Sequence, residues 1–399
     1  MNKKRKKYST ATHEGPDLDV VASFALLKER YGLEMTHPLY LKGGDEVINN
    51  SFGVIPIDRG QTEFDHHGKR IQETSAWLVA KKLGILEERA VQQLLSLVKR
   101  SDLQGISLPL DLSDLTKCVQ RNQGLSNQEK LEIGIRAVED TLFFRRNSLQ
   151  RDNQWIRKII SDFTLAKEII SLKIQRYCDQ LKSEKFERAF DVVEIGVAAR
   201  KQFGKKLAEK LVNELLEFVY QDSVQFFMAK KEIKEKAMRI MIKGKTIIAC
   251  VTDNTKFNPA ARTEGALVII QRNTSGHTQI SFDTKRVNPR LPDTLVSLFR
   301  LEELLIQEHE IPNIDLRRPG KISEVPEWYF YCAPQIGRKK PGRFILNGSL
   351  TATDIPVSQI PLETLLHITS CAVRFSPRFN WGKWKQQRIA LHQQKTGDT

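Results

Sequence analysis

Acidic and imidazole side chains, the groups that bind divalent cations, gather at several points within the first 102 residues. In the first of them, residues 12–19 (THEGPDLD), His13, Asp17 and Asp19 follow a short strand-like run and a Gly-Pro turn. Residues two apart in extended backbone point to the same side, so three ligands could meet one cation here. Asp and Gly are also common turn and helix N-cap residues, and this segment alone leaves both interpretations open.

A second group follows an apolar run in residues 53–68 (GVIPIDRGQTEFDHHG). The run places Asp58 at the carboxyl end of a predicted strand, and a loop then presents Asp65, His66 and His67 in succession. A single histidine is more often a packing or surface residue. Two adjacent histidines beside one Asp, and just beyond another, are better explained as a metal ligand with a neighbour that orients it or takes part in catalysis.

A further carboxylate comes at the end of an apolar helical run, residues 91–105 (VQQLLSLVKRSDLQG), which presents Asp102 beside Gly105. A negative charge at a helix C-terminus is unfavourable, because that end of the helix dipole is already partly negative. A nearby cation would offset this cost. Standing alone, Asp102 would be better explained as a solvated loop residue.

The elements that must position these residues alternate in type along the first hundred residues. Short apolar runs and amphipathic stretches follow one another at residues 8–12, 20–32, 53–60 and 73–84. This alternation is typical of an α/β fold with a parallel sheet, in which ligands gather where strands end and loops begin.

The rest of the chain changes character twice. From about residue 125, apolar residues recur every three to four positions, as between Trp155 and Leu181, which predicts a helical section whose apolar stripe is core. From about residue 243, short β-rich runs with one inserted helix predict a smaller α/β domain. The predicted domains are therefore residues 1–124, 125–242 and 243–399.

Composition limits the classes of partner. The formal net charge is +15, which favours polyanionic partners, although a basic surface that only keeps the protein in solution fits equally well. The five cysteines are scattered and odd in number, which does not suggest a disulfide framework or a zinc ribbon. No apolar run resembles a secretory signal or approaches the roughly 18 residues of a membrane span. A cytoplasmic protein without a membrane partner is expected.

Taken in order, these motifs carry a family resemblance. H-x-x-x-D-x-D after the first strand, an Asp that closes a later strand, D-H-H, and an Asp after a helix resemble the four-motif pattern of the DHH phosphoesterase superfamily. The resemblance covers roughly residues 8–110. This superfamily includes RecJ-type single-strand exonucleases, nano-RNases that degrade short oligonucleotides and cyclic dinucleotides, manganese-dependent inorganic pyrophosphatases, and MYG-type hydrolases.

The resemblance implies a two-metal catalytic site in a cleft between the domains. In it, His13 and Asp17 would hold one cation, Asp19, His66 and Asp102 the other, and Asp58 would bridge them. It also implies that His67 lies beside the leaving or bridging oxygen and that Asp65 orients the histidine pair. Carboxylates and two imidazoles suit Mn²⁺ best, with Mg²⁺ or Co²⁺ as alternatives, whereas the absence of thiolates disfavours Zn²⁺.

The C-terminal third departs from the family pattern. It lacks the glycine-rich G-G-x-G-H loop with which family members grip the substrate phosphate. Two segments, residues 265–286 and 343–350, stand at the corresponding distance. Their candidate substrate-binding residues are His277, Lys285, Arg286, Arg343, Asn347 and Ser349. Backbone N–H groups around Gly348 could cradle a phosphate, but Asn-Gly is also a common hairpin turn.

The function predicted from these features is a metal-dependent phosphodiesterase that acts on single-stranded nucleic acid, short oligonucleotides or a related cyclic nucleotide. One alternative is an enzyme like the manganese-dependent inorganic pyrophosphatases. Another is a non-catalytic nucleic-acid-binding protein on a DHH scaffold, against which the complete ligand set argues. The basic, aromatic tail at residues 374–388 fits either base stacking or a helix that packs its aromatic residues inward.

Overall fold

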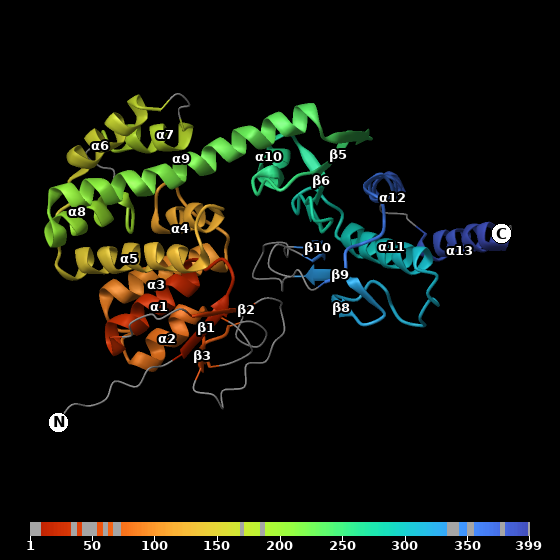
Figure 1. Ribbon diagram of the computed structural model, residues 1–399, viewed down its shortest axis with the longest axis horizontal. Coiled ribbons are helices and arrows are strands. Elements are labelled where there is room, and N and C mark those ends of the chain that lie inside the picture. Colours follow the sequence, from red (N-terminus) through yellow and green to blue (C-terminus); the bar gives the residue numbers. More distant parts are fainter. Residues whose placement is uncertain are drawn as a thin grey trace. The chain divides into compact units, whose positions relative to one another are not determined.

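The computed structural model describes residues 9–32, 38–41, 54–58, 63–66, 73–167, 171–183, 188–332, 343–348, 355–375 and 380–397 (Figure 1). The chain divides into two compact units, Met1–Val224 and Gln225–Thr399, and this boundary falls within the 31-residue helix α9 (Lys205–Glu235). The α/β class expected from the sequence is confirmed. The predicted cleft between domains stays a prediction.

A parallel sheet lies at the N-terminus of the first unit, as predicted. Its described strands are β1 (Ser9–His13), β2 (Leu39–Leu41) and β3 (Val54–Pro56), in the order β2-β1-β3, and both outer strands run parallel to β1. Parallel strands end at the same edge of a sheet. The residues that follow β1 and β3 are therefore delivered to one place.

Helices make up most of the rest of the first unit, including its helical section. They are α1 (Leu18–Tyr31), α2 (Ser75–Leu83), α3 (Arg89–Asp102), α4 (Leu112–Arg121), α5 (Asn127–Arg146), α6 (Asn153–Leu165), α7 (Leu172–Gln180) and α8 (Val192–Phe203). One hydrophobic core extends from Leu18 to Val219.

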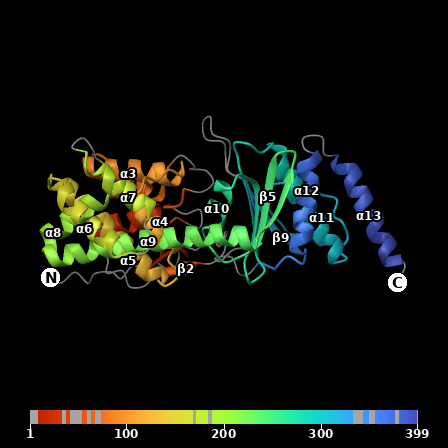
Figure 2. The same ribbon diagram turned by 90° about the horizontal axis from the view of Figure 1, so that it is seen from above.

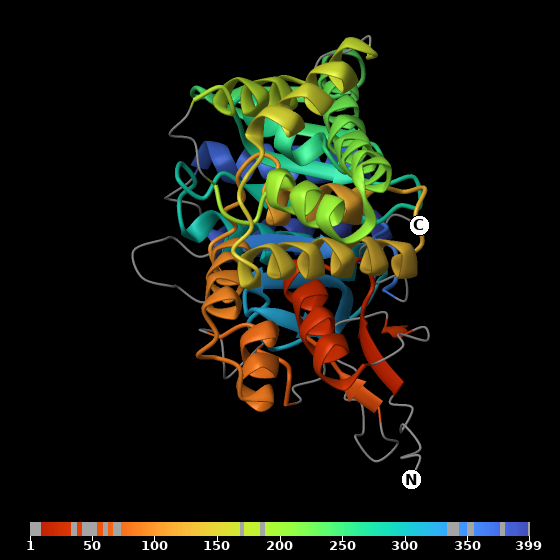
Figure 3. The ribbon, with the colours of Figure 1, turned by 90° about the vertical axis from the view of Figure 1, so that its left-hand side faces the viewer.

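The helical section belongs to the same compact unit as the sheet because α5 packs directly on α1 (Figure 3). Gly134 permits this approach, since a Cβ at that position would lie 2.8 Å from the side chain of Val21. The structure thus has two compact units where the sequence analysis predicts three domains. Apolar residues at helical spacing show that one face of a helix is buried, but they do not show which other segment packs against it.

A seven-stranded sheet forms the second unit, in the order β4-β5-β6-β7-β10-β9-β8. The strands are β4 (Met238–Ile242), β5 (Lys245–Val251), β6 (Ala266–Arg272), β7 (Thr278–Phe282), β8 (Gly320–Ile322), β9 (Val325–Cys332) and β10 (Arg343–Asn347). Only β5 and β6 pair in parallel among these described strands.

Strand β4 lies where the sequence predicts the end of the helical section. Instead it forms a hairpin with β5 through Lys243 and Gly244, whose φ angles are 49° and 73°. Two positive φ angles in succession are typical of the tight turns that join antiparallel strands. The second unit therefore begins before residue 243.

Helices cover both faces of this sheet (Figure 2). Helices α11 (Arg290–Ile306) and α12 (Leu362–Phe375) pack on one face, and α10 (Phe257–Thr263) packs on the other, over β5 and β6. Helix α13 (Trp381–Gly397) places Trp384 against the core of this unit, and its Arg388 pairs with Glu302. These two contacts favour an inward-packing tail over base stacking.

None of the helices in the described parts of the chain combines the length and the apolar character needed to cross a membrane.

Candidate metal centre

The first ligand segment connects β1 to α1. His13 is the last residue of β1, and Asp17 is the N-cap of α1, where its Oδ1 accepts hydrogen bonds from the N–H groups of Asp19 (3.0 Å) and Val20 (3.1 Å). Gly15 makes the turn between them at φ 69°, a left-handed conformation that favours glycine. The N-cap interpretation of Asp17 is confirmed. It leaves the other carboxylate oxygen for a further partner.

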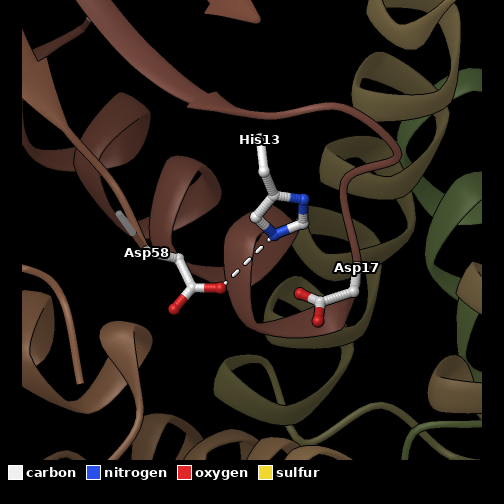
Figure 4. A group of neighbouring side chains, drawn as sticks. All are labelled: His13, Asp17 and Asp58. Carbon is white, nitrogen blue, oxygen red and sulfur yellow. Dashed lines mark ion pairs between the residues drawn. The ribbon is translucent and has the colours of Figure 1, made fainter. Parts of the chain in front are cut away.

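Asp58 follows β3 and has a positive φ of 57°. The chain is fixed on both sides of it, because Ile57 N–H donates to the Ala11 carbonyl (2.8 Å) and Asp58 N–H donates to the Phe64 carbonyl (3.0 Å). Asp and Asn tolerate this backbone region better than most residues, although it still costs about 1 kcal/mol. The strained backbone aims the Asp58 carboxylate at His13, with 3.3 Å between Oδ2 and Nε2 (Figure 4).

The six predicted ligands form two groups of three. One contains His13, Asp17 and Asp58 (Figure 4), and the other contains Asp19, His66 and Asp102. Within each group, one potential ligand atom per residue lies within 4.8 Å of the other two. The structure thus brings together side chains from the ends of two strands, the start of α1, a loop and the end of α3.

A single carboxylate joins the two groups. While Asp58 Oδ2 faces His13, its Oδ1 lies 3.2 Å from Nε2 of His66. The same His66 nitrogen lies 3.4 Å from Asp102 Oδ2 and 3.7 Å from Asp19 Oδ2. Asp58 therefore has the position expected of a residue that bridges two cations.

Two other predicted residues are less well defined by the structure. Asp65 is buried beside His66, and its role in orienting the histidine pair stays a prediction. His67, the predicted neighbour of the reacting oxygen, lies outside the described residues.

The first turn of α2 also belongs to the site, which the sequence did not predict. The Ser75 hydroxyl donates to Asp58 Oδ1 (2.8 Å) and its N–H donates to Asp19 Oδ2 (2.7 Å), while Ala76 N–H donates to Asp19 Oδ1 (2.7 Å). The positive end of a helix dipole adds to these bonds. One helix start thus orients a carboxylate from each group of three.

We expect the Ser75→Ala variant to lose its hydroxyl bond to Asp58 while keeping the backbone bond to Asp19. The removal of a group that orients a metal ligand typically costs roughly 10- to 100-fold in metal affinity or activity. The Mn²⁺ concentration for half-maximal activity should rise accordingly, as measured by titrating Mn²⁺ in the hydrolysis assay. Ser161→Ala, on an exposed face of α6, is the control. An unchanged Mn²⁺ dependence in Ser75→Ala would show that the hydroxyl does not orient Asp58.

The carboxylates repel one another at this site. Burial raises the pKa of Asp19 well above its usual value, and the charges of Asp58, Asp17 and Asp102 raise it further. Burial and the charge of Asp58 also raise the pKa of Asp17. A buried cluster of like charges is unfavourable unless positive charge compensates it. Divalent cations at the two groups would supply that charge.

Both histidines take on positive charge in the absence of cations. Burial lowers the pKa of His13, but its hydrogen bond to Asp58 and the charges of Asp17 and Asp58 outweigh this and raise the pKa to about 9. Burial also lowers the pKa of His66, but its hydrogen bond to Asp58 and the charges of the nearby carboxylates outweigh this and raise the pKa to about 9. Protons therefore take the place of cations at the metal-free site.

This predicts a pH-dependent stability for the metal-free protein. The folded state keeps the protons of His13 and His66 up to about pH 9, whereas an unfolded histidine loses its proton near its ordinary pKa of 6.5. Since the folded state binds more protons in this window, its free energy of unfolding should fall as pH rises from about 6.5 to about 9. Urea unfolding in the presence of a chelator, at several pH values, measures this free energy of unfolding. His66→Gln should flatten the slope, whereas the exposed His309→Gln should not. An equal slope in His66→Gln and the unmodified protein would contradict this assignment.

The predicted substrate-binding residues of the second unit divide between the two ends of the paired strands β7 and β10. His277 and Asn347 lie at one end, and Lys285, Arg286 and Arg343 lie at the other. Arg343, at the start of β10, pairs with Asp293 of α11 (3.1 Å), and Arg286 pairs with Asp283 (2.5 Å). Lys285 is exposed. The two arginines thus hold elements of the unit together, and the structure gives them no common phosphate site among the described residues.

Asn347, at the opposite end of β10, is fully buried. Its amide nitrogen donates to the carbonyls of Glu327 (2.9 Å) and Pro356 (2.8 Å), and its oxygen accepts from Ser358 N–H (3.1 Å). These bonds make it a structural residue. Ser349 lies outside the described residues. His277 lines a cavity of the second unit.

Comparison with known proteins leaves the family open. No protein-family model matches the chain, and no curated protein matches it. The solved structures that are similar include RecJ from Thermus thermophilus in complex with Mg²⁺ (TM-score 0.37, 11% identity) and with Mn²⁺ (TM-score 0.36, 12% identity). These alignments cover 93% of this chain and 50% and 53% of those chains, so the chain spans about half the length of the RecJ proteins. A putative family II inorganic pyrophosphatase from Methanococcus jannaschii is also similar (TM-score 0.17, 12% identity, 69% of this chain and 86% of that chain).

Proposed function

We propose that this chain is a two-metal phosphodiesterase that hydrolyses single-stranded nucleic acid, short oligonucleotides or a related cyclic nucleotide. The observation that carries the proposal is the position of Asp58, one carboxylate that faces both groups of candidate ligands. Two cations held on either side of it would clamp the attacking and leaving oxygens of a phosphodiester and lower the pKa of the attacking water.

The donor set supports this choice of cofactor. Four carboxylates and two imidazoles, without a thiolate, suit Mn²⁺, and also Mg²⁺ or Co²⁺. The carboxylates are oriented in advance, because Asp17 caps α1 and Asp19 accepts two N–H groups of α2. A site that is held in its binding geometry does not have to be ordered when the cation arrives.

The residues around the cations have distinct tasks in this proposal. Asp58, which is oriented by the Ser75 hydroxyl, would hold both ions. His67 would stand beside the reacting oxygen and Asp65 would orient the histidines, as the superfamily resemblance implies. The substrate class is supported by the net charge of +15, because a basic protein attracts an extended polyanion.

A parallel assay of four substrates tests the proposal. Purified protein with Mn²⁺ is offered a labelled single-stranded oligonucleotide, a dinucleotide, a cyclic dinucleotide and pyrophosphate. We expect hydrolysis of at least one phosphodiester and loss of activity in chelator. Hydrolysis of pyrophosphate alone would show that the chain is an inorganic pyrophosphatase and not a phosphodiesterase. Retention of nucleic acid without turnover of any substrate would favour a non-catalytic binding protein.

A further inference from the structure

The second unit contains a cavity of about 360 Å³ within its own residues. It lies at the carboxyl ends of β5 and β6, the parallel pair among the described strands of the sheet, and is lined by Asp253, Asn258, Gln271, His277, Gln279 and Leu346, among others. The carboxyl ends of parallel strands are common ligand sites, and this volume is within the range of small-molecule pockets. We call it the His277 cavity.

His277 supplies the polar group that needs a partner. Its side chain lines the cavity, the residue is only 8% exposed, and its Nδ1 is buried without a hydrogen-bond partner among the described residues. The backbone around it is rigid, because His277 N–H donates to Asn273 Oδ1 (2.8 Å) and Asn273 N–H donates to the His277 carbonyl (2.9 Å). A buried nitrogen without a partner is unfavourable, so the imidazole on the cavity wall has hydrogen-bonding capacity left for a ligand.

The amide groups of the wall are held in fixed orientations. The Gln271 amide nitrogen donates to the carbonyls of Thr252 and Asn254 (3.1 Å each), and Asn258 donates to the Gln271 side-chain oxygen (2.8 Å). By contrast, the Gln279 amide makes no hydrogen bond to any part of the chain that the structure describes. Gln279 and His277 thus offer both a donor and an acceptor to a ligand.

The charges of the residues that line the His277 cavity disfavour phosphate as its ligand. No lysine or arginine is found among the described residues that line the cavity. The one charged residue in that described lining, Asp253, already accepts hydrogen bonds from the N–H (2.9 Å) and the hydroxyl (2.7 Å) of Thr274. A neutral polar ligand therefore fits this site, and an anion does not. This changes the chemistry expected of His277, which the sequence had placed among phosphate-binding residues.

Aromatic residues extend the surface beside the cavity. Leu346 pairs with Gln279 on one side and with Tyr329 on the other, so the three side chains share one face of the sheet. Tyr329 is 38% exposed and Tyr331, two residues further along that face, is 42% exposed. Exposed aromatic rings on a sheet face, beside fixed amide groups, are typical of sites that bind planar heterocycles.

We propose that the His277 cavity binds a nucleobase through hydrogen bonds from His277 and Gln279 to the edge of the base. The choice of a base over other neutral polar ligands rests on the proposed function, which supplies a nucleic-acid substrate. The Gln279 amide offers a donor and an acceptor side by side, which matches the paired donors and acceptors along a base edge. The site thus selects for the base, whereas the metal centre acts on the phosphate.

Calorimetric titration of the full-length protein tests the inference. Adenosine, guanosine, cytidine and uridine are titrated into the protein in chelator, with inorganic phosphate and glucose as comparison ligands. We expect at least one nucleoside to bind and phosphate and glucose not to bind. His277→Ala and Gln279→Ala should each weaken nucleoside binding at least about tenfold, the loss of one hydrogen bond to a buried group. His309→Ala, an exposed histidine of the same unit, should bind as the unmodified protein does.

Each outcome decides the inference. Binding of glucose in preference to nucleosides, absence of nucleoside binding, or equal binding by His277→Ala and His309→Ala would overturn it. The outcome is separable from that of the proposed function, because the titration needs neither cation nor turnover. Nucleoside binding without hydrolysis of any substrate would uphold the His277 cavity and refute the phosphodiesterase. Hydrolysis without nucleoside binding would uphold the phosphodiesterase and refute the nucleobase site in the His277 cavity.

Discussion

Asp58→Asn is expected to lower the rate of hydrolysis on the order of 10³-fold, equivalent to about 4 kcal/mol of transition-state stabilisation. The change removes the negative charge that faces both groups of ligands and keeps the shape of the side chain. Asn tolerates the positive φ of 57° at this position, so the backbone needs no adjustment. The rate constants of both proteins with the best substrate of the four-substrate assay measure the effect.

Asp162→Asn is the matched control, because Asp162 is exposed on α6 in the same unit. It should retain the full rate. Circular dichroism and thermal unfolding of Asp58→Asn show whether it is folded. A folded Asp58→Asn that hydrolyses substrate at the unmodified rate would refute the bridging role of Asp58 and, with it, the two-metal proposal.

Mn²⁺ is expected to raise the melting temperature of the first unit by roughly 5–10 °C. A ligand present at about a hundred times its dissociation constant stabilises the folded state by about 2.7 kcal/mol, and each kcal/mol adds about 2–4 °C in a unit of this size. The physical reason is the relief of repulsion among the buried carboxylates. Calorimetric scans in chelator and in increasing Mn²⁺ measure the shift without requiring any substrate.

A doubly substituted protein, Asp19→Asn with Asp58→Asn, provides the comparison for this shift. It has a weakened ligand set in each group, so Mn²⁺ should move its melting temperature by only a small fraction of the unmodified shift. A similar Mn²⁺ shift in both proteins would mean that the ion binds elsewhere.

Much of the candidate centre could be predicted because its signals are local in sequence. His13 and Asp58 each follow a short apolar run, and the ends of parallel strands meet at one edge of a sheet. Asp102 follows an amphipathic run that forms α3, as expected. The spacing of apolar residues and the turn residues are sufficient to place the candidate ligands at the ends of strands and helices. The order of the motifs then indicates that these ends lie close together in the fold.

What could not be predicted depends on partners distant in the sequence. Ser75 lies in a stretch that has the pattern of an ordinary helix start, and only the folded chain brings its hydroxyl to Asp58. Arg343 resembled a free phosphate-binding cation because its partner Asp293 is 50 positions away. Likewise, the helical period of residues 125–242 indicates burial but does not indicate that α1 is the neighbour.

The wide spacing of the candidate ligands in the sequence has a consequence for how the site forms during folding. They span most of the first hundred residues, and the last of them, Asp102, is the final residue of α3, which packs on α1. Contacts between segments so far apart form late, after loop closure has been achieved by the apolar core. Small zinc modules fold around their ion. In this chain, by contrast, the first unit would fold first and its metal site would bind ions afterwards.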